Sequence, residues 1–190
     1  RAGLERIGDA WMYADLYTTL AGAASVLRPE TYLEIGVRRG HSMSMVAAHA
    51  PSCAIYGFDM WVQDYAGLPN PGKAFVEQQL GRIGYGGRVE FTDGDSASTI
   101  PAFLRTHPDL YFDLITVDGD HSARGARVDL CNVMPRLKVG GVLVFDDIAN
   151  ASHPDLQGVW DDTVAARPDM ATWSFDEAGF GVAIAIRTPG

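Results

Sequence analysis

Residues 31–42 read TYLEIGVRRGHS, a mostly apolar run that leads into two glycines and a serine. A short apolar run bounded by glycine is typical of a buried strand with helices on both of its faces. Gly36 and Gly40 would let the backbone turn tightly and pass close to a ligand, with the N–H groups of a following helix facing it. The stretch therefore predicts one strand–turn–helix unit of an α/β fold.

The same unit repeats along the chain. Further strands are expected at 54–59, 89–94, 112–118 and 140–147. Helical patterns separate the strands, at 41–50, 73–84, 96–106 and 122–137. The last two helical patterns each carry apolar residues on one side: Ile100, Phe103 and Leu104, then Ala126, Leu130, Val133, Met134 and Leu137. This alternation predicts a doubly wound, mostly parallel sheet with right-handed crossovers and helices on both faces.

The pattern changes after residue 148. A helix with Leu156, Val159, Trp160 and Val164 precedes two strand-like runs that are joined only by residues 177–179. Such a short connection requires a hairpin, so one of these strands must run antiparallel to the sheet. The expected fold class is therefore α/β, with a seven-stranded sheet that ends in an antiparallel hairpin.

We expect a single domain, because the 190 residues form one continuous pattern around one core. It has three parts: a helical lid or cap at 1–29, the core at 30–148, and the C-terminal helix and hairpin at 149–190. A helix at 9–27 would lie across the sheet or its open end. Trp11, Met12 and Tyr13 in that helix would form a lid or pack on the core.

Composition excludes some classes of protein. The chain is 47% hydrophobic and 21% charged, as ordinary globular proteins are, and no apolar run reaches the ~18 residues of a membrane helix. The net charge of −9 makes nucleic acid and anionic membranes unexpected partners. Cys53 and Cys131 lie in separate apolar segments without a C-x-x-C motif. We therefore expect two buried, reduced thiols and a cytoplasmic protein.

Ligands of such sheets bind outside the carboxyl ends of the strands, and polar residues gather there in this sequence. The first strand ends with Glu34, Gly36, Gly40 and Ser42, in the pattern E-x-G-x-x-x-G-x-S. This pattern differs from the G-x-G-x-x-G of dinucleotide sites, and the acid suits a cationic ligand better than a phosphate. A tight strand–helix turn without a ligand is the alternative.

The next two strand ends could bind a nucleoside. Asp59 is placed to accept the hydroxyls of a ribose, and Met60 and Trp61 after it could cover an adenine face. Asp95 and Ser96 would approach the adenine edge from the other side. A turn carboxylate at the second strand and a helix N-cap at the third remain open.

The last two strands of the core end in acids. Asp118, Asp146 and Asp147 would meet at neighbouring strand ends, and a hard divalent cation would remove their mutual repulsion. Mg²⁺ fits best, with Ca²⁺ or Mn²⁺ as alternatives. His121, three residues after Asp118, could take a proton from a bound hydroxyl. A capped turn at 118–122 and a solvated acid pair would be the structural alternatives.

Taken together, five motifs resemble those of the class I S-adenosylmethionine-dependent methyltransferases. They occur in order at 34–42, 57–61, 93–96, 117–121 and 145–147: EIGVRRGHS, GFDMW, DGDS, VDGDH and FDD. The sequence is most similar to the metal-dependent O-methyltransferases, which include catechol O-methyltransferase and bacterial sugar and natural-product enzymes. The resemblance covers about residues 31–148 and implies a Rossmann-like sheet.

The resemblance also implies roles for single residues. The cofactor S-adenosylmethionine would contact residues at the first four strand ends: Glu34, Gly36, Gly40, Ser42, Asp59, Met60, Asp95, Ser96, Ala97 and Asp118. The metal would be bound by Asp118, Asp146 and Asp147, and the catalytic residues would be His121 and Asp118. Catechol enzymes have Asn at the position of Asp147 and Lys at that of His121. The histidine shifts the expected acceptor from catechols toward sugar or natural-product hydroxyls.

Other roles are less defined by the sequence. Asp120 would ligate, orient His121 or cap a helix, and His153 could reach the site or be a solvated loop residue. The loop 61–73 is rich in glycine and proline and is expected to contact the small-molecule hydroxyl acceptor. The apolar C-terminal hairpin would be either a homo-oligomer interface or a plain sheet edge.

Two other functions fit a similar sheet. An NAD-linked oxidoreductase is disfavoured by the absence of G-x-G-x-x-G and by the three converging acids. A non-catalytic module that binds S-adenosylmethionine is disfavoured because it would have no use for the acids and His121.

Overall fold

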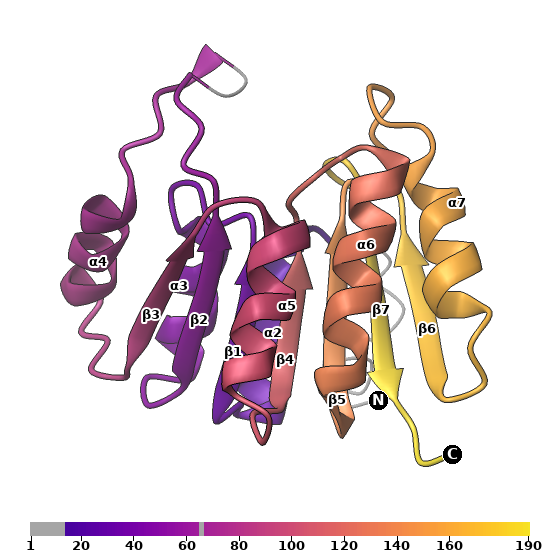
Figure 1. Cartoon of the computed structure of the whole chain (residues 1–190), viewed down its shortest axis with the longest axis horizontal. Helices are drawn as coiled ribbons and strands as arrows, with labels where there is room; N and C mark the ends of the chain where they lie inside the picture. The colour runs from indigo at the N-terminus through magenta and orange to yellow at the C-terminus, as the bar shows by residue number, and fades with distance from the viewer. Residues whose placement is uncertain (1–13, 65–66) are drawn as a thin grey trace.

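A single seven-stranded sheet forms the centre of the molecule (Figure 1). The computed structural model describes residues 14–64 and 67–190. The strands are β1 (Thr31–Ile35), β2 (Ala54–Asp59), β3 (Val89–Asp93), β4 (Phe112–Val117), β5 (Leu137–Asp146), β6 (Met170–Phe175) and β7 (Val182–Arg187). Their order across the sheet is β3-β2-β1-β4-β5-β7-β6. Strands β1 to β5 are parallel, and β7 is antiparallel to both β5 and β6. The predicted fold class and C-terminal hairpin are therefore confirmed.

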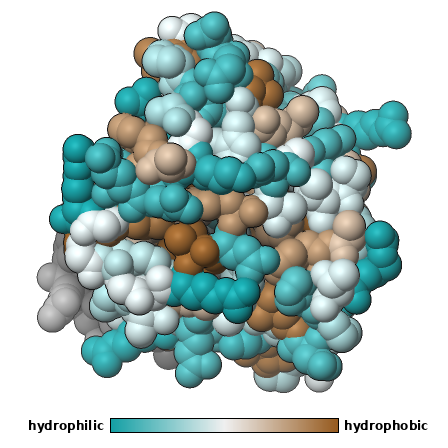
Figure 2. Space-filling view, turned by 60° about the vertical axis from the view of Figure 1, so that its left-hand side comes forward, coloured by the Kyte–Doolittle hydropathy of each residue, from teal (hydrophilic) through white to brown (hydrophobic). Residues whose placement is uncertain are grey.

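Helices cover both faces of this sheet. On one face lie α2 (Leu16–Leu27), α3 (His41–His49) and α4 (Lys73–Arg82), and on the other α5 (Ser96–Thr106), α6 (Ala123–Val133) and α7 (Leu156–Trp160). Figure 1 shows α5 and α6 in front of the sheet and α2 and α3 behind it. Figure 2 shows a mostly hydrophilic surface, in which apolar atoms appear in separate patches between polar ones. Within the described ranges, no helix is long and apolar enough to cross a membrane.

The N-terminal helix begins later than its apolar pattern predicts. Asp15 caps α2, because its side chain accepts a hydrogen bond of 2.8 Å from the N–H of Thr18. Leu20 and Ala24 on the inner side are fully buried, and α2 packs on the sheet beside α3. Residues 9–13 of the predicted helix lie outside the described residues, as do Trp11, Met12 and Tyr13.

Helix α6 is shorter than predicted. It ends at Val133 because Pro135 interrupts it; a 3-10 turn, η3 (Met134–Arg136), follows, and β5 begins at Leu137. The predicted apolar side of this segment is buried as expected. Cys53 is buried, but Cys131 is exposed, so the expectation of two buried thiols was wrong. The apolar residues near Cys131 in the sequence form one face of α6, and Cys131 lies on another face of the helix.

The strand order reverses between β1 and β4, because the chain runs outward from β1 to β2 and β3 but from β4 to β5 on the other side. A crevice at the carboxyl end of such a switch point is the usual ligand site. Gly36 follows β1 there with φ +88°. A Cβ at this position would lie 1.8 Å from the carbonyl oxygen of Asp118. Only glycine permits this close approach of the two strand ends.

One charged side chain is buried between α6 and the sheet. Asp129 is 1% exposed, and neither carboxylate oxygen has a hydrogen-bond partner in the described part of the chain. Its Oδ2 atom lies against Gly119, just after β4. Burial raises the pKa of Asp129 to about 6, although the nearby Ser96 hydroxyl and Asp120 backbone act in the opposite direction.

The close contact at Gly36 can be tested with a matched glycine. Gly84 has a similar φ of +76°, but no atom lies within 4 Å of its Cβ position. Gly84→Ala should cost only the left-handed backbone strain, about 1–2 kcal/mol. Gly36→Ala should cost more, by roughly 1–3 kcal/mol or beyond, because the strand ends must separate. Urea unfolding measures both, and equal losses would show that the close approach is unimportant.

The buried Asp129 predicts a pH dependence of stability. Its pKa is raised in the folded protein, so its protonated form is favoured there, and stability is lost as the pH rises from about 4 through about 6. Asp129→Asn removes this ionisation. Between pH ~4 and pH ~7, the wild type should lose about 2–3 kcal/mol of its free energy of unfolding relative to the variant. Urea unfolding at several pH values checks this, and a constant difference would contradict it.

Candidate active site

A cavity of about 200 Å³ opens at the carboxyl ends of β1 and β4. Its walls come from the start of α2, the β1–α3 turn, Leu68 of the predicted acceptor loop 61–73 and the residue that follows β4. They include Tyr17, Gly36, Arg38, His41, Ser42 and Asp118. Three of the sequence-predicted residues, Gly36, Ser42 and Asp118, therefore lie on one cavity. Gly40 precedes α3 at the same turn, with φ +69°, and Val76 of α4 packs where its Cβ would be.

Glu34 lies beneath this cavity and does not line it. Its side chain is fully buried; the hydroxyl of Ser42 donates to Oε1, and the hydroxyl of Tyr32 lies 2.8 Å from Oε2. The Tyr32 hydroxyl is also 2.9 Å from the hydroxyl of Thr116 on β4. Burial raises the pKa of Glu34 to about 8, against the lowering effect of the bonds from Ser42 and Tyr32. Glu34 thus orients Ser42 at the cavity wall.

Asp59 connects two loops at the cavity's edge. One carboxylate oxygen accepts the N–H of Arg38 at 2.6 Å, and the other accepts the N–H of Trp61. Each oxygen keeps a further lone pair, so the ribose role predicted for Asp59 is compatible with these bonds. The Trp61 indole donates to Asp93 at 2.9 Å, while Met60 beside it is 61% exposed.

The residues that follow β3 lie beside those that follow β2. Asp95 is the N-cap of α5, and its side chain accepts the N–H of Ala97 at 2.9 Å. The N-cap alternative therefore holds for Asp95. The N–H of Gly94 donates to the carbonyl of Asp59 at 2.9 Å, which keeps this loop beside the second strand end. Asp59, Met60, Asp95, Ser96 and Ala97 thus gather at one edge of the sheet.

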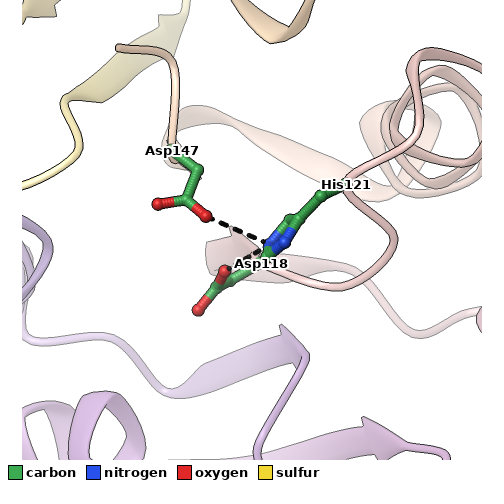
Figure 3. A group of neighbouring side chains, drawn as sticks. All are labelled: Asp118, His121 and Asp147. Atoms are coloured by element: carbon green, nitrogen blue, oxygen red, sulfur yellow. Dashed lines mark hydrogen bonds and ion pairs between the residues drawn. The ribbon is translucent and has the colours of Figure 1, made fainter. Parts of the chain in front are cut away.

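Asp118, His121 and Asp147 converge beside the cavity, as Figure 3 shows. The Nε2 atom of His121 lies 3.2 Å from Oδ1 of Asp118 and 3.3 Å from Oδ2 of Asp147. One ligand atom from each of the three residues lies within 4.8 Å of the others. The hydrogen bond to Asp118 is the main cause that raises the pKa of His121. Burial is the main cause that raises the pKa of Asp118.

Asp146 is not one of the three converging residues, although it is near them. Burial, followed by the charges of Asp118 and Asp147, raises its pKa to about 8. Asp146 is the last residue of β5, whereas Asp147 has a left-handed backbone with φ 66°. Successive strand residues point to opposite sides, and this turn brings Asp147 to His121.

The structure gives different places to Asp120 and His153, whose roles the sequence left open. Asp120 accepts the N–H of Ser122 at 2.8 Å and packs against Gly125, so its side chain lies over the start of α6. It is not part of the cluster formed by Asp118, His121 and Asp147. His153 does reach the site, because its ring centroid is 4.7 Å from that of His121.

Six residues of the cavity wall were not among the predicted site residues: Leu16, Tyr17, Val37, Arg38, Arg39 and His41. Tyr17 on α2 contacts the ring of His41 edge-on. Burial raises its pKa, and the charges of Asp118 and Asp146 contribute, so its hydroxyl lies within their electrostatic reach. Arg38 lies in the glycine turn, and only its position there marks it in the sequence.

Comparisons with known proteins agree with this geometry. A family model described as a methyltransferase domain matches residues 33–148. The O-methyltransferase TomG from Streptomyces achromogenes, solved with S-adenosylmethionine, has a TM-score of 0.73 at 20% identity, over 98% of this chain and 86% of that one. CalS11, a TDP-rhamnose 3′-O-methyltransferase of calicheamicin biosynthesis, has a TM-score of 0.66 at 20% identity, over 90% and 76%.

An O-methyltransferase from Bacillus cereus, solved with SAH, has a TM-score of 0.71 at 15% identity, over 98% of this chain and 86% of that one. No curated protein sequence matches the chain significantly. The family model spans more than half of the chain, and at these identities the solved structures establish the shared fold. The chain therefore belongs to the methyltransferase domain family and has the fold of the class I O-methyltransferases.

Proposed function

We propose that the protein is an S-adenosylmethionine-dependent, divalent-metal-assisted O-methyltransferase that acts on a hydroxyl of a small molecule. The observation that carries this proposal is the convergence of Asp118, His121 and Asp147 beside a cavity at the β1–β4 switch point. Family membership and neighbours solved with S-adenosylmethionine or SAH support the choice of cofactor.

The chain's own residues suit this cofactor at the cavity and at the carboxyl ends of β2 and β3. When bound, S-adenosylmethionine supplies a methyl group activated on a sulfonium. Gly36 would let the backbone approach the methionine part, and Ser42, whose hydroxyl donates to Glu34, would accept a hydrogen bond from that part. Asp59 would accept the ribose hydroxyls, while Met60, Asp95, Ser96 and Ala97 would frame the adenine. The carboxylate of Asp118 at the cavity wall would attract the cationic part.

A divalent cation fits the acidic cluster. Asp118 and Asp147 converge, and Asp146 is near. Burial and then neighbouring like charges raise the pKa values of Asp118 and Asp146, so a bound cation would relieve this repulsion. Asp118 and Asp147 would hold the metal with Asp146, and their oxygen atoms favour Mg²⁺ or Mn²⁺. When bound, such a cation supplies the charge that lowers the pKa of a nearby acceptor hydroxyl.

His121 is the proposed proton acceptor. Its Nε2 atom points into the space between Asp118 and Asp147 (Figure 3), which is where an acceptor hydroxyl would meet it. The hydrogen bond to Asp118 is the main cause that raises the pKa of His121. A cation held by the carboxylates would oppose this effect, so that Nε2 would lose its proton to solvent and could then take the proton of the acceptor.

The acceptor is proposed to be a sugar or natural-product hydroxyl. His121 stands where catechol enzymes have lysine, and two of the similar structures are a TDP-rhamnose enzyme and an enzyme of tomaymycin synthesis. The net charge of −9 further disfavours nucleic acid as the methyl acceptor.

Replacing His121 tests the proton transfer. His121→Ala should lower turnover by about 10²–10⁴-fold, because general-base catalysis contributes that much, while cofactor binding stays unchanged. Turnover is measured with methyl-labelled S-adenosylmethionine and a panel that includes TDP-rhamnose and catechol, and binding by calorimetry. His49→Ala is the control, because His49 is at the C-terminal end of α3, away from the carboxyl ends of the strands. Near-normal turnover of His121→Ala would remove the assignment.

Replacing the acids tests the metal. Asp118→Asn and Asp147→Asn should each weaken Mn²⁺ binding by about 10–100-fold, because an anionic ligand becomes neutral. Titration followed by electron paramagnetic resonance measures the affinity. Asp109→Asn, at an exposed position before β4, should bind Mn²⁺ as the wild type does. Full turnover after exhaustive chelation would leave the methyltransferase fold intact but contradict the metal's role.

A further inference from the structure

We propose that His153 is a positioning residue for His121: its imidazole packs on the His121 ring and keeps Nε2 directed between Asp118 and Asp147. This inference rests on the proposed function, in which His121 takes the acceptor's proton. His153 itself would move no proton. Its contribution would be to restrict the rotation of a ring whose orientation the reaction requires.

The contact between the two rings carries the proposal. Their centroids are 4.7 Å apart, and their planes are inclined by 50°. This tilted arrangement is among those that aromatic rings prefer. Both side chains are only partly exposed. The Nε2 atom of His121 faces the two carboxylates, so the carboxylates hold one end of the imidazole while His153 packs against its ring.

The backbone around His153 is well held. Its N–H donates to the carbonyl of Asn150 at 2.8 Å, and the N–H of Asn150 donates to the carbonyl of Asp147 at 3.1 Å. The N–H of Ala149 donates to the carbonyl of Phe180 at 2.7 Å, which ties the segment to the turn before β7. These bonds hold the backbone from which the His153 ring packs on that of His121.

The same segment supplies both neighbours of His121. Asp147 begins it with φ 66°, and His153 follows six residues later through two successive backbone turns. His121 comes from the separate connection between β4 and α6. The contact with His153 would thus hold the connection after β4 against the connection after β5. The proposed proton acceptor His121 and Asp147 would then keep a constant relative position.

Two substitutions separate packing from nitrogen chemistry. His153→Phe keeps a flat ring but has no nitrogen, and should retain turnover within about threefold of the wild type. His153→Ala removes the ring and should lower kcat by about 10-fold or more, with the KM for S-adenosylmethionine unchanged, because small misplacements of a reacting group are costly. His49→Ala and His49→Phe are matched controls at a distant exposed histidine.

A second measurement does not depend on methyl transfer. In ¹⁵N-labelled holoenzyme with Mg²⁺ and S-adenosylmethionine, the ring resonances of His121 should be sharp for wild type and His153→Phe, and broadened or shifted for His153→Ala. Unchanged His121 resonances and unchanged kcat in His153→Ala would overturn the proposal. So would a His153→Phe variant as impaired as His153→Ala with unchanged His121 resonances, because that result requires the nitrogen.

The two proposals can fail separately. If wild-type protein transfers no methyl group to the test acceptors, or if His121→Ala remains active, the proposed function is contradicted, but the resonances still report whether His153 orders the His121 ring. If His121→Ala is inactive while both measurements are normal in His153→Ala, the proposed function stands and the role of His153 is rejected.

Discussion

The close approach of the β1 and β4 ends is the constraint on which the site depends. The backbone after β1 passes so near the carbonyl of Asp118 that no side chain fits at Gly36. The N–H of Asp118 donates to the carbonyl of Ile35 at 2.9 Å, and that of Gly36 donates to the carbonyl of Phe58 at 2.9 Å. These two hydrogen bonds hold the carboxyl ends of β1, β2 and β4 together. The cavity wall and the first acid of the cluster are placed by this backbone geometry.

Around this junction the protein buries carboxyl groups that would be more stable in water. Glu34, Asp129 and Asp146 all have raised pKa values for which burial is the first cause. They differ in their partners. Glu34 has hydroxyl donors and Asp146 has like charges beside it. Asp129 makes no hydrogen bond of standard length and angle within the described ranges, although the Ser96 hydroxyl and the Asp120 backbone are near it. Under the proposed function, a cation at the site would offset the like charges beside Asp146.

Much of the fold could be predicted, because strand and helix periods are strong and local. The strands were found within a few residues, and convergence of Asp118, His121 and Asp147 follows from their places after adjacent parallel strands. What failed depends on side-chain direction or on tertiary contacts. Cys131 lies in an apolar segment yet faces solvent. The contact of His153 with His121 requires the loop's hydrogen bonds, which no sequence pattern records.

The position of β7 has a consequence for how the protein is made. This strand is the last in the chain, but it lies inside the sheet, between β5 and β6. Val182 pairs with Asp146, and the carbonyl of Phe180 holds the segment that leads from Asp147 to His153. During synthesis the N-terminal strands can assemble first, since domains form as the chain emerges. The acidic cluster, however, acquires its full support only when residues 180–187 have left the ribosome. A nascent chain would therefore hold an incomplete site until translation has passed this segment.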